Sequence, residues 1–276
     1  MIDTKKIDVI NEAEPFINEL KSRPNGGCCS WDHCRRAFRR AAYNRNPDSS
    51  CLTKLTDCEY TVCGDEYQGI NCRLCDNNLA LNLMTYLASW GMYRGSSFLR
   101  EYDYTIHIGA VKILMDKKYL PLFDPNLYYS NSNNYIELTA EVFCKIWDYY
   151  VSFANMIPTR AGNSKHVSDT LVTKILMGVY GCMPAYDRYF KTGISSHGGT
   201  QNVNKRNIKR VLGELVEITK ALKPQIDSIL SSAKVDWDKC GLYTDMKILD
   251  MTFWNIGKKI GGSKNKSSKV PVTATI

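Results

Sequence analysis

Asp187 is the acidic residue of this sequence whose surroundings best suit chemistry on a sugar. It follows an apolar segment that ends at Gly181, and Tyr186, Tyr189 and Phe190 stand beside it. A fixed carboxylate of this kind can stabilise positive charge that develops on a sugar ring, and it can orient an attacking water molecule. A carboxylate that caps a helix or joins an ion pair has the same appearance in a sequence. Both roles for Asp187 therefore stay open.

Aromatic side chains and one arginine are candidates for the wall of a binding pocket. Trp90, Tyr93 and Tyr186 could hold a planar base, although most aromatic residues of a globular protein belong to its core. Arg94 lies next to Tyr93 in a segment that we expect to be buried. A buried guanidinium must be paired or must reach a ligand. A structural ion pair and a substrate contact are thus the alternatives for Arg94.

The charge of the chain favours a polyanionic partner. The sequence has 36 basic and 28 acidic residues, which gives a net charge of +8. A phosphate backbone is the commonest polyanion inside cells, so nucleic acid is the expected partner. Solvated helix faces can have the same composition. Our candidates for phosphate contacts lie in one loop and in one basic helix: Arg160, Asn163, Ser164, Lys165 and His166, and Lys205, Arg206, Lys209 and Arg210.

Common catalytic motifs are missing from the sequence. It has no P-loop, dinucleotide fingerprint, nucleophile elbow or H-E-x-x-H motif. None of the four histidines has a spacing partner that suggests a metal site or a catalytic triad. We therefore expect no cofactor.

The eleven cysteines fit reduced thiols better than a disulfide framework, because the chain shows no secretory signal. Eight of them fall between Cys28 and Cys75, and Cys72 and Cys75 form a C-x-x-C pair. A strong zinc signal needs a second such pair at a fixed distance, and this chain has none. A structural zinc, or a zinc-containing adaptor built on residues 58–75, remains an alternative.

The elements that must position these residues are predicted to be helices. Apolar residues recur at helical spacing, alternating strand patterns are almost absent, and no repeat is found, so we expect an all-α fold. We predict one domain over residues 1–260, an irregular Cys-rich insertion at 46–75 and a flexible basic tail at 261–276. The absence of a signal peptide predicts a cytoplasmic protein. The expected helices are 7–20, 32–44, 79–99, 106–117, 139–156, 168–180, 203–224 and 244–260.

Two of these helices carry features of interest. In the apolar helix 79–99, Gly91 and Gly95 are four residues apart and would share a face that another backbone can approach. In helix 32–44, arginines at positions 35, 36, 39 and 40 would form one face, opposite Trp31 and Phe38. That face would contact phosphates or simply be solvated.

The stretch from Asn163 to Phe190 resembles the second half of the helix-hairpin-helix motif of DNA glycosylases. The resemblance implies that a loop and a helix N-terminus hold a phosphate through backbone N–H groups. It also implies that an aspartate after the helix serves the excision of a flipped base, and Asp187 occupies that place. This chain lacks the glycine-rich hairpin, and Ser168 and Asp169 stand where bifunctional members have a lysine. A monofunctional enzyme that uses water is therefore implied.

A broader resemblance covers most of the chain. It is carried by Ser30-Trp-Asp-His-Cys34, by the segment from Tyr86 to Phe98 and by the segment from Thr173 to Phe190. These segments look like a family of bacterial proteins that includes antiphage DNA glycosylases, which remove glucosylated hydroxymethylcytosine from viral DNA. The resemblance implies double-stranded phage DNA as the substrate, a pocket that accepts a bulky sugar, and abasic sites as the product.

The expected function is thus that of a monofunctional DNA glycosylase. Asp187 would be its catalytic carboxylate, with Trp90, Tyr93, Arg94 and Tyr186 around the flipped base. The alternative is a non-catalytic helical protein that binds nucleic acid or regulates another protein, in which Asp187 only caps a helix.

Overall fold

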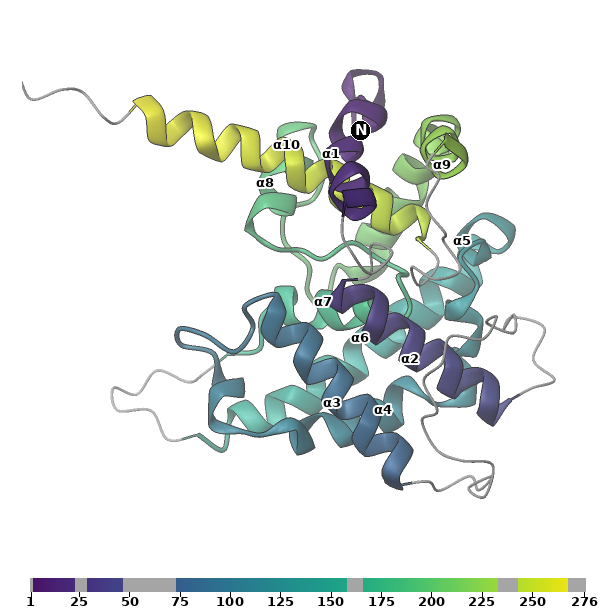
Figure 1. Cartoon of the computed structure of the whole chain (residues 1–276), viewed down its shortest axis with the longest axis vertical. Coiled ribbons are helices and arrows are strands. Elements are labelled where there is room, and N and C mark those ends of the chain that lie inside the picture. Colours follow the sequence, from purple (N-terminus) through teal and green to yellow (C-terminus); the bar gives the residue numbers. More distant parts are fainter. Residues whose placement is uncertain (1, 23–28, 47–72, 158–165, 233–242, 268–276) are drawn as a thin grey trace, which may run out of the picture.

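All regular elements in the described part of the chain are helices, which confirms the all-α class (Figure 1). The computed structural model describes residues 2–22, 29–46, 73–157, 166–232 and 243–267. The α-helices are α1 Val9–Ser22, α2 Ser30–Arg45, α3 Arg73–Ser89, α4 Ile108–Leu114, α5 Leu127–Ser130, α6 Ser132–Ala154, α7 Asp169–Val179, α8 Arg188–Ser196, α9 Ile208–Ser232 and α10 Asp245–Ser267. Short 3-10 helices span Thr4–Lys6, Phe98–Glu101, Tyr104–His107 and Lys117–Phe123.

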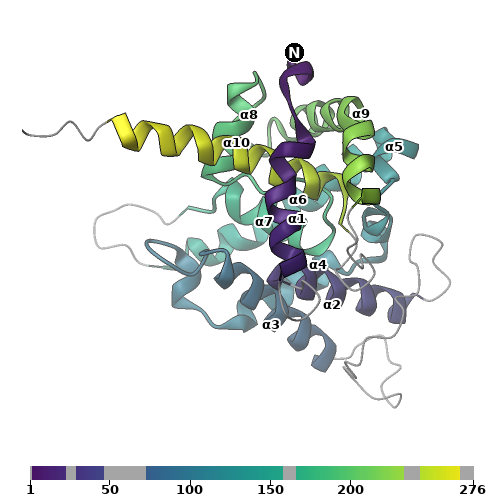
Figure 2. The ribbon, with the colours of Figure 1, turned by 45° about the horizontal axis from the view of Figure 1, so that its top comes forward.

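The helices pack as two groups that meet along the middle of the molecule (Figures 1 and 2). In the first group α2, α3 and α6 pack against α7, and α4 packs against α3 and α6. In the second group α8, α1 and α9 all pack against α10. Contacts between α6 and α9 join the groups. The end of α3 and the starts of α7 and α8, which are far apart in the sequence, therefore lie close to α10 where the two groups meet.

Helix α7 is the buried centre of the first group. Every residue from Leu171 to Val179 is buried, as expected for a helix with apolar side chains on nearly all sides. The Ser168 side chain caps its first turn by accepting from the Leu171 amide. The helix stops before Gly181, whose φ of 63° lies in the left-handed region. These bounds confirm the prediction of a helix from residue 168 or 169 that stops at Gly181.

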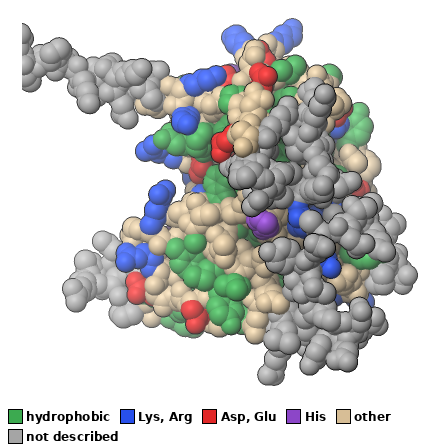
Figure 3. Space-filling model, in the orientation of Figure 1, with side chains coloured by type: hydrophobic (Ala, Val, Ile, Leu, Met, Phe, Trp, Pro, Cys, Tyr) green, Lys and Arg blue, Asp and Glu red, His purple; other side chains and the backbone are tan. Residues whose placement is uncertain are grey.

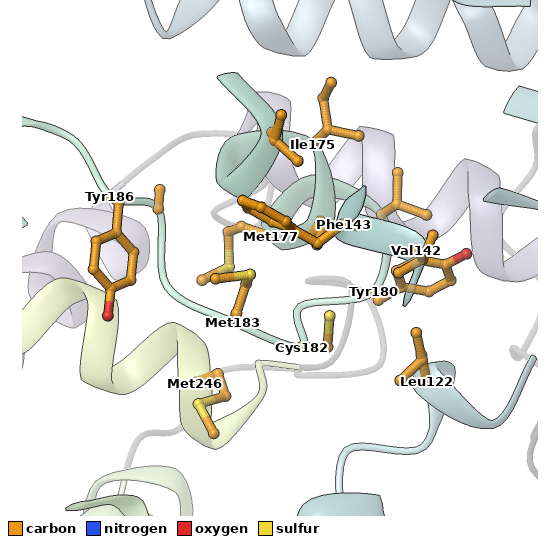
Figure 4. Close-up of a cluster of buried hydrophobic side chains, with 14 of the residues drawn as sticks. Leu122, Val142, Phe143, Ile175, Met177, Tyr180, Cys182, Met183, Tyr186 and Met246 are labelled. Carbon is orange, nitrogen blue, oxygen red and sulfur yellow. The ribbon is translucent and has the colours of Figure 1, made fainter. Parts of the chain in front are cut away.

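A segment without regular secondary structure, residues 182–186, passes through the core between α7 and α10 (Figure 4). The Ala185 amide donates to Asp250 Oδ1 of α10 at 2.9 Å, and the Tyr186 amide donates to Thr173 Oγ1 of α7 at 2.9 Å. Buried backbone groups that are bonded on both sides leave such a segment little freedom. Asp187 is therefore delivered to the boundary between the two groups from a fixed backbone.

The predicted helix over residues 79–99 is wrong at its end. Helix α3 ends at Ser89, and a turn follows in which Gly91 and Gly95 have φ values of 72° and 64°. Such positive φ values favour glycine and are incompatible with a continuing right-handed helix. The two glycines therefore do not form a helix face, and Arg94 is exposed rather than buried.

Two of the four arginines on the predicted face of α2 are buried, so they cannot contact solvent or a phosphate backbone. Arg35 is fully buried and Arg39 is 4% exposed, because α2 lies against α3 and α7. Arg35 Nη1 donates to the carbonyl oxygen of Val179 at the C-terminus of α7, at 3.3 Å. A cation is stabilised at that end of a helix. Burial lowers the pKa of Arg35 to about 9.

Helices α8 and α10 cross with their backbones in contact. A Cβ atom at Gly257 would lie 1.9 Å from the carbonyl oxygen of Tyr189, and one at Gly193 would lie 2.0 Å from that of Phe253. Only glycine allows this approach. Helix α10 also runs past residue 260 to Ser267, into the segment predicted as a flexible tail. No helix in the described ranges is long and apolar enough to cross a bilayer.

Candidate active site in the cleft around Asp187

A cleft of about 740 Å³ lies where the two groups of helices meet. Its walls come from the end of α3 and the turn after it, and from the first turns of α7 and α8, with Trp254 contributed by α10. Clefts of this volume are typical of sites for small molecules. The lining residues that enter the argument are Trp90, Tyr93, Arg94, Lys174, Asp187, Arg188, Tyr189 and Trp254.

Asp187 combines a structural role with access to the cleft. As the N-cap of α8 it accepts hydrogen bonds at Oδ1 from the Tyr189 and Phe190 amides, both at 3.0 Å. Its second oxygen, Oδ2, has no hydrogen-bond partner among the described residues. The side chain is half-buried and lines the cleft. One oxygen is therefore fixed by the backbone, and the other remains available to a bound molecule.

The surroundings raise the pKa of Asp187 above its ordinary value. Burial is the largest cause, and the negative charge of Asp250 acts in the same direction. The amides of Phe190 and Tyr189 and the positive charge of Lys174 oppose the shift. A carboxylate with a raised pKa is a stronger base than one in water, which suits proton abstraction from water.

Lys174 is a functional candidate that the sequence analysis did not select. It lies on α7, is 4% exposed and lines the cleft. Its ammonium donates to the carbonyl oxygen of Trp90 at 2.9 Å and lies 5.5 Å from the centre of the Trp90 ring. Burial lowers its pKa. The available signal was a single lysine inside an otherwise apolar helical stretch, where it needs partners.

Aromatic rings cover one wall of the cleft at the crossing of α8 and α10. The rings of Tyr189 and Trp254 meet edge to face with centres 5.0 Å apart. Arg188 packs over the Tyr189 ring, with Cζ 4.7 Å from its centre, and donates to the Tyr189 hydroxyl at 2.8 Å. Sequence reasoning missed Trp254, because α10 follows in the chain long after the other lining segments.

Three of the four predicted pocket residues line the cleft, and the fourth does not. Trp90, Tyr93 and Arg94 line it together. Tyr186 is fully buried and is drawn with the buried cluster in Figure 4. Its ring packs on that of Phe190 with centres 4.8 Å apart. The placement of Tyr186 in the pocket is therefore corrected. The reason is local: Tyr186 is the last residue of the buried segment between α7 and α10, whereas Asp187 is the N-cap of α8 and lines the cleft.

The predicted phosphate contacts fall into three cases. Arg160, Asn163, Ser164 and Lys165 lie outside the described residues. His166 and Arg206 are exposed. The other three cations form ion pairs at the surface: Lys205 with Asp148 at 2.6 Å, Lys209 with Glu137 at 2.6 Å and Arg210 with Glu214 at 2.5 Å. Lys205, Arg206, Lys209 and Arg210 do not belong to the cleft lining.

A metal centre finds no support in the described residues. No group of three or more His, Cys, Asp or Glu side chains there could hold a metal ion. Cys29, Cys34, Cys144 and Cys182 are free thiols. Cys58, Cys63 and Cys72, on which the zinc alternative depends, lie outside the described residues.

The cleft has to be interpreted from its own geometry and chemistry. It joins one carboxylate, three cations and several aromatic rings from four separate segments. Comparisons of the chain with protein-family models, with curated proteins and with solved structures give no match.

Proposed function

We propose that this chain is a monofunctional DNA N-glycosylase that excises a modified base from double-stranded DNA. The observation that carries the proposal is the geometry of Asp187. One of its oxygens is fixed on two backbone amides, and the other is available in a cleft of about 740 Å³. Excision of a base needs one fixed carboxylate beside a space that holds an extruded nucleotide.

The walls of the cleft suit a flipped nucleotide. Trp90, Tyr189 and Trp254 offer flat apolar surfaces on which a base can stack once it has left the duplex. The volume leaves room for a base that carries a further sugar, as glucosylated hydroxymethylcytosine does. A glucosylated cytosine of phage DNA is accordingly our proposed substrate.

Asp187 would act on the bond between the sugar C1′ and the base nitrogen. As that bond breaks, positive charge develops on the sugar, and the negative carboxylate stabilises it. Oδ2 orients a water molecule and accepts one of its protons, while the water oxygen bonds to C1′ and the electron pair of the broken bond leaves with the base. The products are a free base and an abasic site. Lys174 helps to keep Asp187 ionised by its nearby positive charge.

Cations around the cleft would hold the phosphates on both sides of the flipped nucleotide. Arg94 is exposed at one rim, where its guanidinium packs over Gly91, and Arg188 is exposed at another. Lys and Arg side chains gather along the edge of the molecule that includes α8 and α10, at the left of Figure 3. Arg94, Lys174 and Arg188 thus place positive charge at the cleft itself.

The order of elements also agrees with a glycosylase of the helix-hairpin-helix type. Helix α6 is followed by a connection, then by α7, and then by the aspartate that caps α8. The N-terminus of α7 contributes Thr170 to the cleft, and a helix N-terminus attracts phosphate. The proposed phosphate loop itself, residues 158–165, lies outside the described residues.

The second candidate function is a non-catalytic protein that binds nucleic acid. The observation in its favour is that Asp187 has a sufficient structural reason to be present, because it caps α8. The two functions differ in what Asp187 does beyond the cap. Binding without catalysis predicts no chemical change in DNA.

The test is an assay for abasic sites. Wild-type protein and Asp187→Asn are incubated with duplexes that contain cytosine, hydroxymethylcytosine or its glucosylated form, and alkali-labile sites are then counted. We expect cleavage of the glucosylated duplex by wild type and a loss of at least about a hundredfold in Asp187→Asn. A matched control is Asp116→Asn, which alters another capping carboxylate, one that does not line the cleft. Equal activity of both aspartate variants, or no activity of wild type on any duplex, would exclude the enzyme.

A further inference from the structure

A chain of three hydrogen-bonded side chains leads from the core to the cleft. The hydroxyl of Tyr150 lies 2.6 Å from His107 Nδ1, and the hydroxyl of Tyr93 lies 2.5 Å from His107 Nε2. Tyr150 belongs to α6, His107 ends the 3-10 helix before α4, and Tyr93 lines the cleft in the turn after α3. The chain thus connects a residue of the candidate site with the interior of the first helix group.

His107 is neutral in this environment. It is fully buried, and burial lowers its pKa to about 3. A neutral imidazole has one N–H donor and one nitrogen that accepts. One of the two tyrosine hydroxyls must therefore donate to the ring, and the other must accept from it.

Burial of Tyr150 decides the direction of this chain. Its side chain is fully buried, and within the described ranges its hydroxyl has one partner, His107 Nδ1. If Nδ1 carried the proton, the hydroxyl hydrogen of Tyr150 would be left without an acceptor in the core, which is costly. Tyr150 therefore donates to Nδ1, and the proton of the imidazole is on Nε2. Nε2–H then donates to the hydroxyl oxygen of Tyr93.

The consequence for Tyr93 is that its own hydroxyl hydrogen is not used in the bond to His107. Its hydroxyl has His107 as its partner among the described residues, and in that bond the Tyr93 oxygen is the acceptor. Burial raises the pKa of Tyr93, so the hydrogen stays in place at neutral pH. Accepting a bond from the imidazole also polarises the hydroxyl and strengthens it as a donor.

We propose that Tyr93 is a specificity-determining donor, held by the buried pair His107 and Tyr150, that selects a ligand with an acceptor oxygen at this wall of the cleft. On the proposed glycosylase function, on which the identity of the ligand rests, the acceptor is a carbonyl oxygen of the base or a hydroxyl oxygen of an attached sugar. His107 and Tyr150 are positioning residues, because they reach the ligand only through Tyr93.

The first test measures the tautomer of His107 and needs no activity. Nitrogen-15 NMR of the labelled full chain, with the His107 signals assigned from a His107→Gln sample, distinguishes a protonated Nε2 from a protonated Nδ1. We expect protonated Nε2 in wild type and no titration of His107 down to about pH 5. In Tyr150→Phe the donor to Nδ1 is gone, and we expect the second tautomer to become populated. Protonated Nδ1 in wild type would overturn the inference.

The second test measures which oxygen the donor recognises. Tyr93→Phe is combined with Asp187→Asn, which prevents turnover, and its affinity for duplexes with hydroxymethylcytosine or the glucosylated base is compared with that of Asp187→Asn alone. Loss of one neutral hydrogen bond predicts about three- to tenfold weaker binding. Loss on both duplexes assigns the acceptor to the base, and loss on the glucosylated duplex alone assigns it to the sugar.

A tyrosine outside the cleft provides the control for the binding measurement. Tyr129→Phe removes the hydroxyl of an exposed tyrosine that does not line the cleft, and it should leave both affinities unchanged. If the double variant binds each duplex as tightly as Asp187→Asn alone does, the role of Tyr93 is overturned, even if abasic sites are produced. Protonated Nε2 together with no abasic product overturns the glycosylase while the donor at Tyr93 stands.

Discussion

Asp187 has two roles: one carboxylate oxygen caps helix α8, and the other is available in the cleft. Its raised pKa shows that burial of the charge outweighs the help of the two amides. A charge that is held at a cost to the fold is common where a group is kept for chemistry. The structure therefore links the stability of the protein to its proposed activity at this residue.

Replacement of Asp187 by Asn should raise stability at neutral pH while it abolishes base excision. Asn caps a helix about as well as Asp and has no charge to bury. Because the folded-state pKa of Asp187 is raised, its contribution to folding is fully present below the unfolded pKa and is lost as pH rises through the folded pKa. The melting temperature of Asp187→Asn should thus be higher than that of wild type at pH 7 and equal to it near pH 3. A variant that is less stable at pH 7 would contradict this reading.

Replacement of Lys174 by Met should move the pH dependence of activity. The positive charge of Lys174 lowers the pKa of Asp187, so that its removal lets this pKa rise. Activity that needs ionised Asp187 should then fall off at higher pH than in wild type, as seen in the acid limb of the kcat/KM profile. Lys145→Met, which removes a lysine paired with Glu141 outside the cleft, should leave that limb in place. If the acid limb of the kcat/KM profile does not move in Lys174→Met, the charge of Lys174 does not influence the ionisation of Asp187.

Residues with a distinctive local context could be predicted from the sequence. Asp187 follows an apolar helix, and Trp90 and Tyr93 are aromatic residues that could hold a planar base; each lines the cleft. Tyr186 is also aromatic and next to Asp187, but it is buried because its ring packs on Phe190 in the core. The role of Lys174 could not be predicted from local sequence, because its partner Trp90 is far away in the sequence.

The crossing of α8 and α10 positions the aromatic wall of the cleft. The backbones touch at Gly193 and Gly257, and this contact sets the distance between Tyr189 on α8 and Trp254 on α10. A side chain at either glycine would push the helices apart. The shape of the aromatic wall therefore depends on two residues that do not line it.

Gly257→Ala should destabilise the protein and weaken ligand binding. Its Cβ would lie 1.9 Å from the Tyr189 carbonyl oxygen, a backbone atom that cannot turn away. We expect a loss of about 1–3 kcal/mol in the free energy of unfolding, measured by urea denaturation. Gly213→Ala on α9 is the control, because a Cβ there meets nothing within 4 Å. That variant should gain about 0.5–1 kcal/mol from helix propensity. Equal effects of both substitutions would show that the crossing is not tight.

Helices with clear capping and stop residues in the sequence were predicted well, and helices without such residues were not. Ser168 as a cap and Gly181 as a stop fixed both ends of α7. The stop of α3 was missed because an isolated glycine does not reveal the sign of its φ in a sequence. Helix α6 begins at Ser132, ahead of the predicted start at residue 139, because Asn131 provides the cap. Helix α8 was not predicted because it spans nine residues, fewer than the window of about 11–18 residues over which helical periodicity is recognised in a sequence.

At the scale of the whole molecule, the distribution of charge matters more than its sum. The basic helix that was predicted to bind phosphate has Lys209 paired with Glu137 and Arg210 paired with Glu214. Arg94 and Arg188 stand at the cleft and form no ion pair with any described carboxylate. We therefore expect the arginines of the cleft, rather than α9, to dominate contacts with DNA.

Salt dependence of DNA binding can separate these two surfaces. Each phosphate contact contributes about 0.9 to the slope of log K against the logarithm of salt concentration. Arg188→Gln should lower that slope by about one contact, as measured by fluorescence anisotropy from 50 to 200 mM salt. Lys209→Gln should change it little, because Glu137 already neutralises that lysine. A larger change for Lys209→Gln would place the DNA along α9 instead.

The fold class followed from the sequence, but the assembled cleft did not. Helical periodicity is a local property, so the all-α class could be inferred from it. The cleft brings together segments around residues 90, 174, 187 and 254, and their meeting depends on how the two helix groups pack. A single sequence carries no direct signal for such long-range contacts.

On the proposed function, Asp187 directs water to the sugar carbon of a flipped nucleotide. This step can be tested by mass spectrometry of the products formed from glucosylated hydroxymethylcytosine duplexes in water enriched in oxygen-18. We expect one heavy oxygen in the abasic sugar, none in the released base, and neither product with Asp187→Asn. Release of no base by wild type, equal release by Asp187→Asn, or a borohydride-trapped adduct between the sugar and Lys174 would contradict it.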